Sequence, residues 1–209
     1  MLLSTAYLPP VEYFAAIAAN YSFESIYIEA CEHYQKQSYR NRFKFLAPDG
    51  PQALNFPVVH EGGTFSLPIQ EIKVDWSTPW AAKTKRALDT AYYSSAFYEY
   101  YRDELFSIYD SRPVTLWGLN TALTQWLLRK FGIPAELVPT HSFCPPDSDE
   151  YGEDLRGVIH PKRDNSILSE LGLEKPYYQV FGDKFGFVGG LSAIDLLFNE
   201  GPGAIDYLI

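Results

Sequence analysis

The order of the secondary-structure patterns along the chain is the feature that most constrains its fold. Short segments of strand character, apolar or alternating, lie early in the chain, at 2–8, 25–29, 42–46, 52–59 and 69–74. Amphipathic helical patterns then follow one another from Pro79 to Phe131, where a strong apolar stripe ends just before Gly132. Strands that come early and helices that follow in a run favour a mixed sheet over a regular βαβ repeat. We therefore expect an α/β fold, a single domain over 1–209 in which a mixed β-sheet from N-terminal strands is covered by helices.

The remaining segments predict shorter elements. A helix is expected over 11–20, after two prolines that suit a first helical turn, and a short strand over 135–138. The segment 139–151 is rich in Pro, Asp and Ser, which is typical of a loop. Beyond it the sequence predicts a strand over 177–181 and a helix over 191–198.

The charge of the chain limits the partners that it can have. The formal net charge is −9 and the sequence pI is about 4.9. Nonspecific binding to nucleic acid depends on an excess of Lys and Arg against the phosphate backbone, so we expect no nucleic-acid partner.

The cysteines and the apolar runs indicate the compartment. Cys31 and Cys144 are the only cysteines in the sequence, and they lack the Cys-x-x-Cys spacing that signals a zinc site. No apolar run approaches the roughly 20 residues that span a bilayer, and the first residues lack a basic region followed by a sustained apolar core. We expect a cytoplasmic protein without a membrane span.

A cationic stretch from His33 to Arg42 contrasts with this acidic chain. If the stretch is extended, side chains two apart project to the same face, so Arg40 and Arg42 would lie beside Lys36. The planar fork of arginine can bind a carboxylate or a phosphate through two parallel hydrogen bonds. The stretch is therefore a candidate site for an anionic small molecule. The alternative is a solvated edge strand whose basic side chains pair with neighbouring acids.

Other reactive residues give weaker signals. Cys31 and His33, with His160 far downstream, permit a cysteine nucleophile, because a thiolate needs a base that meets it in the fold. The four histidines show no metal-ligand spacing, so we predict no structural metal. No phosphate-loop, dinucleotide-binding or hydrolase motif occurs, and the sequence names no cofactor. A second basic cluster lies at 158–163.

Four motifs together carry a resemblance to a known family. They read S-T-A-Y-L-P-P-V-E-Y-F near the start, E-H-Y-Q-K-Q-S-Y-R-N-R, A-Y-Y-S-S-A-F-Y-E-Y-Y, and L-S-A-I-D-L-L-F-N-E-G-P near the end. The chain resembles the WbqC-like protein family over nearly its whole length. Many members of that family are encoded among genes for bacterial surface polysaccharide synthesis. The resemblance thus implies a cytoplasmic step on an activated sugar or on its acyl or aminoacyl substituent.

The cationic stretch and the positions that match the family give the candidate site residues. The residues expected to handle the reacting group are Tyr7, His33 and Tyr34. The residues expected to bind the substrate are Lys36, Arg40, Asn41, Arg42, Ser192, Asp195 and Asn199. The last three are spaced three and four apart, so one helix face would carry them. The alternative for that face is a helix cap with polar contacts to the strands.

Two functions are compatible with these residues. In the first, the chain is a transferase-like enzyme of glycan precursor metabolism, and Lys36, Arg40 and Arg42 hold a phosphate or a carboxylate of its substrate. In the second, it is a non-catalytic binding or scaffolding protein that recruits a pathway partner through an aromatic surface. Both are compatible with a homo-oligomer.

Overall fold

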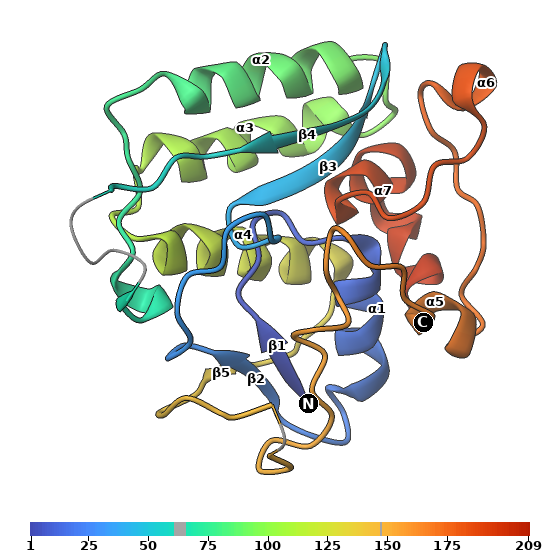
Figure 1. Cartoon of the computed structure of the whole chain (residues 1–209). Helices are drawn as coiled ribbons and strands as arrows, with labels where there is room; N and C mark the ends of the chain where they lie inside the picture. Colours follow the sequence, from blue (N-terminus) through green and yellow to red (C-terminus); the bar gives the residue numbers. More distant parts are fainter. Residues whose placement is uncertain (61–65, 147) are drawn as a thin grey trace.

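Two small sheets and the helices around them share a hydrophobic core that includes side chains from Met1 to Leu208 (Figure 1). The structure is a computed structural model, and it describes residues 1–60, 66–146 and 148–209. Within these residues no helix is both long enough and apolar enough to cross a membrane.

The first sheet is parallel and draws its strands from distant parts of the sequence. Strands β1 (Leu2–Ser4), β2 (Ile26–Glu29) and β5 (Leu137–Pro139) lie in the order β1-β2-β5, so β2 is central. The apolar side chains of β1 and β2 are buried, as expected for a parallel sheet that is covered by other elements. Because the three strands run the same way, their carboxyl ends meet at one edge.

The second sheet is an antiparallel hairpin. Strand β3 (Arg42–Ala47) pairs with β4 (Gly50–Asn55) across the short turn that the sequence predicts. Along β3 the side chains alternate, with Phe43 and Phe45 buried and the basic residues between them half-buried. The hairpin therefore contributes aromatic rings to the core and turns a basic face outward.

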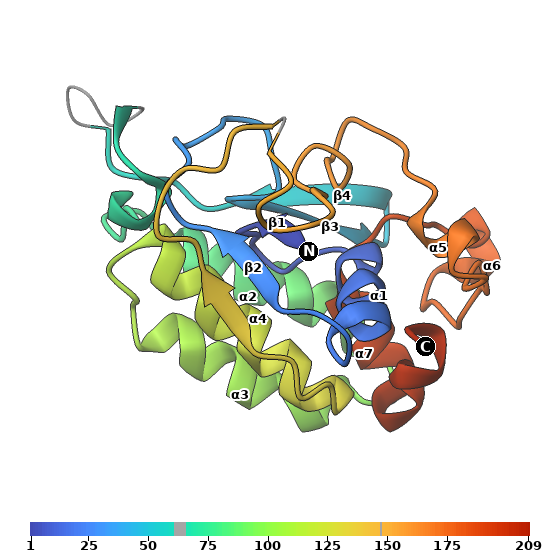
Figure 2. The same cartoon turned by 90° about the horizontal axis from the view of Figure 1, so that it is seen from below.

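Four longer helices cover the sheets. They are α1 (Val11–Asn20), α2 (Trp80–Tyr92), α3 (Tyr98–Asp110) and α4 (Leu116–Phe131). Helix α4 begins where the Thr115 side chain accepts a hydrogen bond from the Gly118 N–H at 3.1 Å, and it ends at Gly132, whose φ of 70° is left-handed. Figure 2 shows α3 and α4 on one side of the molecule and the β3–β4 hairpin on the other.

The C-terminal part returns to this core through short elements. They are α5 (Ile167–Glu170), α6 (Gly182–Phe185), α7 (Ala193–Glu200) and the 3₁₀ helix η3 (Gly201–Tyr207). Helix α7 is buried from Ala193 to Asn199, and it packs against α1, α3 and α4. The last segment is thus part of the core.

The structure confirms the predicted α/β class. Parallel and antiparallel strand pairs both occur, but in separate sheets, and one strand of the parallel sheet comes from the second half of the chain. The helices predicted over 11–20 and 191–198 form close to the expected bounds. The segment 139–151 is irregular after β5 where the structure describes it, and residue 147 lies outside the described residues.

Three segments predicted to be extended are not strands, and each has a local reason. Over 69–74 the chain forms the 3₁₀ helix η2 (Ile69–Glu71), since Ile69 and Ile72, three apart, are both fully buried. Over 177–181 it is irregular, because the Gln179 side chain takes up the backbone N–H and C=O of Val188. The stretch from Lys36 is a turn with φ of 60° at Gln37, so its side chains do not alternate between two faces.

Candidate functional site

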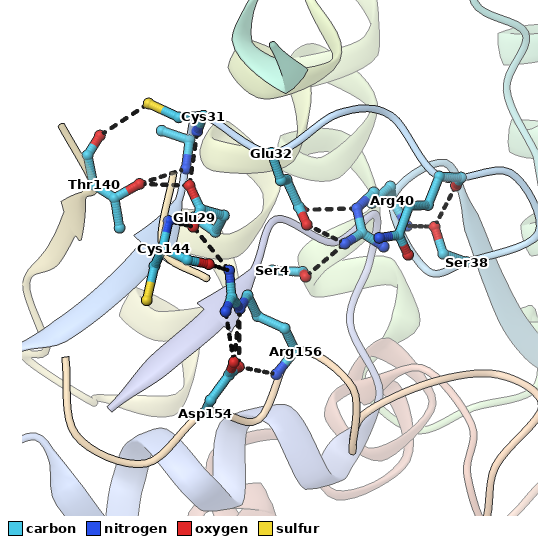
Figure 3. Close-up of polar contacts among 12 residues, drawn as sticks. Ser4, Glu29, Cys31, Glu32, Ser38, Arg40, Thr140, Cys144, Asp154 and Arg156 are labelled. Atoms are coloured by element: carbon cyan, nitrogen blue, oxygen red, sulfur yellow. Dashed lines mark hydrogen bonds and ion pairs between the residues drawn. The ribbon is translucent and has the colours of Figure 1, made fainter. Parts of the chain in front are cut away.

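The carboxyl ends of the parallel strands gather a polar cluster (Figure 3). Ser4 ends β1, Glu29 ends β2 and Thr140 follows β5. In open α/β sheets, ligands bind outside this edge. The Glu29 carboxylate is fully buried and accepts hydrogen bonds from the backbone N–H groups of Cys31 and Cys144, each at 2.9 Å, and from Thr140 Oγ1 at 2.8 Å. These protein donors occupy Glu29, so we assign it to holding the surrounding loops rather than to proton transfer.

Arg156 joins a later loop to this edge. Its Nη1 donates to Glu29 Oε2 at 2.9 Å and to the Cys144 carbonyl at 2.8 Å, and its Nη2 donates to Asp154 Oδ2 at 2.6 Å. Burial opposes ionisation of Asp154, but the hydrogen bonds from Arg156 outweigh it, so the pKa of Asp154 is lowered. The loop is fixed against the sheet by a charged network.

Arg40 forms a second buried ion pair beside the first. Its Nε donates to Glu32 Oε1 at 2.8 Å, its Nη2 bonds the other oxygen of the same carboxylate, and Nη2 also donates to Ser4 Oγ at 2.9 Å. Both side chains of the pair are only 4–5% exposed. The Arg40 carbonyl accepts a hydrogen bond from Asn120 on α4 at 2.8 Å. Arg40 therefore directs its fork at a protein carboxylate and ties the turn to the core.

The structure brings the two basic segments of the sequence together. Lys162 Nζ donates to Gln37 Oε1, 125 positions away in the sequence, and Lys44 Nζ donates to the Pro161 carbonyl at 3.0 Å. We refer to the resulting group as the basic surface; its members are Lys36, Arg42, Lys44, His160, Lys162 and Arg163.

His160 lies among the positive charges of the basic surface. His160 is half-buried, and burial is the largest cause that lowers its pKa. The nearby charges that act in the same direction are those of Arg163, Arg40, Lys162 and Lys44. Close grouping of cations in a chain of net charge −9 favours an anionic ligand at this place.

Beneath the basic surface lies a small cavity between the two ion pairs. It is lined by Ser4, Ser38, Tyr39, Arg40, Arg156 and Ile159 among others, and its volume is about 10 Å³. That is room for about one water molecule. A larger ligand would bind on the outside of this edge.

His33, Tyr34 and Asn41 lie next to the basic surface. His33 is exposed, and its backbone pairs with Pro68. Burial raises the pKa of Tyr34, while the charges of Arg40 and Arg42 and a hydrogen bond with Asn41 lower it. The structure therefore brings Tyr34 together with Arg40, Asn41 and Arg42, while His33 and Lys36 are near them in the sequence.

Tyr7 lies apart from them, in the core. It is fully buried, its hydroxyl is 2.8 Å from that of Tyr109, and its ring meets Phe43 and Phe56 edge-on. Burial strongly raises the pKa of Tyr7. Its hydroxyl is closed to a ligand in this conformation, so we give Tyr7 a packing role.

The three predicted residues of the C-terminal helix form a separate interior cluster. Ser192 caps α7 by accepting from the Ile194 N–H, and Asn199 Nδ2 donates to the Asp195 carbonyl at 2.8 Å. Asp195 is 1% exposed and accepts from the hydroxyls of Tyr92 at 2.7 Å and Tyr177 at 2.8 Å. The helix cap of the alternative is present, but the Asp195 side chain contacts α2 and the irregular segment at 177 rather than the strands.

Within the part of the chain that the structure describes, neither histidine considered as a base for Cys31 is hydrogen-bonded to its thiol. The Cys31 Sγ contacts the Thr140 carbonyl at 3.8 Å, and no hydrogen bond joins it to His33 or His160 within the described residues. Among residues 1–60, 66–146 and 148–209, no group of three or more His, Cys, Asp or Glu side chains could hold a metal ion.

Sequence reasoning missed the ion-pair partners at this edge. Glu32 lies eight residues before Arg40, while Arg156 lies far from Glu29 in the sequence. An isolated Asp-Leu-Arg at 154–156 carries no signal of its own, and it comes into contact through a parallel bridge between Asp154 and Leu2 of β1, the strand beside β2.

The comparison with protein families places the chain. The model of the WbqC-like protein family matches residues 5–160. The chain belongs to this family. The match includes Tyr7, the cationic stretch and the loop up to His160, and it stops before α5 and α7. Of the basic surface, Lys36, Arg42, Lys44 and His160 lie within the family region of this WbqC-like protein, and Lys162 and Arg163 lie after it.

A relative extends the likeness to the whole chain. The uncharacterized protein Rv1507c of Mycobacterium tuberculosis is 28% identical over 233 aligned residues, which cover 99% of this chain and 96% of that protein. No solved structure matches.

Proposed function

We propose that this WbqC-like protein is a cytoplasmic, transferase-like enzyme of surface polysaccharide biosynthesis that acts on an activated sugar or on its acyl or aminoacyl substituent. The basic surface binds the phosphate or carboxylate of that substrate. One observation carries the proposal: two basic segments, 125 positions apart at the Lys162–Gln37 contact, meet at the turn whose Arg40 bonds Ser4 at the carboxyl end of β1.

The residues divide into those that contact the substrate and those that position them. Lys36, Arg42 and Lys162 lie on the basic surface and bind the anionic group. Arg40, held by Glu32, fixes the turn that carries Lys36. His33 and Tyr34 are adjacent and handle the reacting group.

A second candidate is a non-catalytic protein that recruits a pathway partner. The observation in its favour is the exposure of aromatic rings near the α2–α3 connection, where Tyr93 is 73% and Tyr100 is 76% exposed. Such a protein needs no small-molecule substrate.

A ligand screen followed by a turnover assay tests the proposal. Nucleotide sugars and acyl or aminoacyl donors are first tested by thermal shift, since a ligand at about 100 times its dissociation constant adds roughly 2.7 kcal/mol to the free energy of unfolding. Products formed from the binding compounds are then sought by mass spectrometry. We expect His33→Gln and Tyr34→Phe to keep binding and to lose turnover. A panel that produces no shift would favour the recruiting protein instead.

A further inference from the structure

A second, larger cavity has no lining residue in common with the basic surface. It has a volume of about 460 Å³ and lies between the start of α1, helix α5, the segment 173–177, the loop at 187–190 and Tyr207. Small-molecule sites commonly fall in the range of about 300–1,000 Å³. Neither the proposed function nor the predicted site residues account for this cavity.

Aromatic side chains build one wall of the cavity. The Tyr177 ring meets Phe187 edge-on at 5.2 Å between centroids and meets Tyr207 edge-on at 5.8 Å. Leu168 and Leu173 add apolar surface. Tyr177 is held in place from behind, because its hydroxyl donates to the buried Asp195 at 2.8 Å. The wall is therefore preformed.

Glu12 supplies a buried acid to the same cavity. Its side chain is only 9% exposed, and Oε2 has no hydrogen-bond partner among the described residues. The other oxygen, Oε1, lies 3.9 Å from the place of a Cβ on the neighbouring Gly190, which also lines the cavity. Burial raises the pKa of Glu12, while a hydrogen bond from the Glu12 backbone N–H and the charge of Lys44 act to lower it. Burying a carboxyl group without donors is costly. Oε2 is enclosed by protein atoms, so a donor from a ligand would reach the Glu12 carboxyl group through Oε1, on the Gly190 side.

We propose that this cavity binds a small organic amine, whose ammonium group donates hydrogen bonds to Glu12 while its apolar body lies against Tyr177 and Phe187. An ammonium group matches the site in two ways. It supplies a positive charge and further hydrogen-bond donors to the buried Glu12 carboxyl group, and the faces of aromatic rings attract cations. The chain already shows the second contact, since Lys175 Nζ lies over the Tyr207 ring at 4.5 Å.

This inference does not depend on the proposed function, because the amine site shares no residue with the basic surface. The two are nevertheless close in the chain: Asn165 lines the cavity two residues after Arg163. Because the two sites share no residue, failure of one site in binding experiments can be told apart from failure of the other.

The test uses a matched pair of probes and the whole chain. Binding of 2-phenylethylammonium and of 2-phenylethanol, which has the same body without the charge, is measured by isothermal titration calorimetry at neutral pH. We expect the ammonium to bind at least about tenfold more tightly, the minimum for one charge-assisted hydrogen bond. Equal affinity of the two probes, or no heat from the ammonium at millimolar concentration, would overturn the proposal.

Variants locate the binding. Glu12→Gln keeps the shape of the side chain and should remove the preference for the ammonium, whereas Glu174→Gln, the same change at an exposed carboxylate on the cavity rim, should retain it. Ser169→Trp, which places a large ring in the cavity and leaves Glu12 intact, should block both probes. Unchanged binding of the ammonium by Glu12→Gln or by Ser169→Trp would contradict the assignment, and thermal melts establish that each variant is folded.

Discussion

Asp195 illustrates at the scale of one residue how burial couples to pH. Burial raises its pKa to about 6, although the hydrogen bonds from Tyr92, Tyr177 and Gln179 act to lower it. In an unfolded chain an aspartate titrates near pH 3.9, so between about pH 4 and 6 the folded state retains a proton that the unfolded state has released. Stability contributed at this site must therefore fall as pH rises through that window, by about 3 kcal/mol for a shift of about two units.

The variant Asp195→Asn removes this titration. Urea unfolding at several pH values gives the free energy of unfolding of the natural chain and of the variant. We expect the difference, natural chain minus variant, to decrease by about 3 kcal/mol between pH 4 and pH 7. Asp183→Asn removes the same charge from an exposed position and serves as the control. Parallel pH profiles of the natural chain and Asp195→Asn would show that the buried carboxyl does not titrate in this way.

Arg40 and Arg42 should respond differently to truncation. Arg40→Ala leaves Glu32 buried without its partner, which typically costs about 3–5 kcal/mol. Arg42 is half-buried at the start of β3, so Arg42→Ala should reduce stability far less and should weaken binding of an anion instead. Chemical unfolding and anion titration of both variants separate the two roles, and equal loss of stability would refute this division.

At the scale of elements, the junction of α7 and η3 depends on a glycine. Gly201 has φ of 56°, and a Cβ there would lie 2.5 Å from ring carbons of Phe97. Gly132, after α4, has φ of 70° with open space around it. Gly132→Ala should therefore cost about 1–2 kcal/mol for the left-handed backbone alone, and Gly201→Ala should cost about 1–3 kcal/mol more because of the overlap. Similar unfolding midpoints for the two variants would contradict the predicted overlap.

The elements that the sequence predicts well are those whose signals are local. Helix α4 has an apolar stripe, a threonine cap and a closing glycine, and it forms almost as expected. The strand predicted over 177–181 does not form because its residues make tertiary contacts: Tyr177 packs against two aromatic rings, and the Gln179 side chain binds the Val188 backbone. Such contacts come from distant residues and leave no periodic pattern.

At the scale of the whole molecule, the sequence predicts the ingredients of the candidate site better than their arrangement. The cationic stretch and the basic cluster at 158–163 are visible in the sequence, but their contact depends on the course of the chain between them. The same holds for the amine cavity, which joins Glu12 to residues more than 150 positions later. The residues on α7, by contrast, share the expected helix face but point into the interior.

The affinity of inorganic pyrophosphate for the basic surface tests the central claim most directly. Calorimetric titrations compare the natural chain with Lys36→Ala/Lys162→Ala, which removes two exposed charges from this surface, and with Lys83→Ala/Arg86→Ala, which removes two from the exposed side of α2. We predict that the first pair weakens binding at least tenfold, since charge-assisted hydrogen bonds contribute about 1.5–3 kcal/mol each, and that the second pair changes it little. Equal affinities for all three proteins would contradict an anion site at the carboxyl end of the parallel sheet.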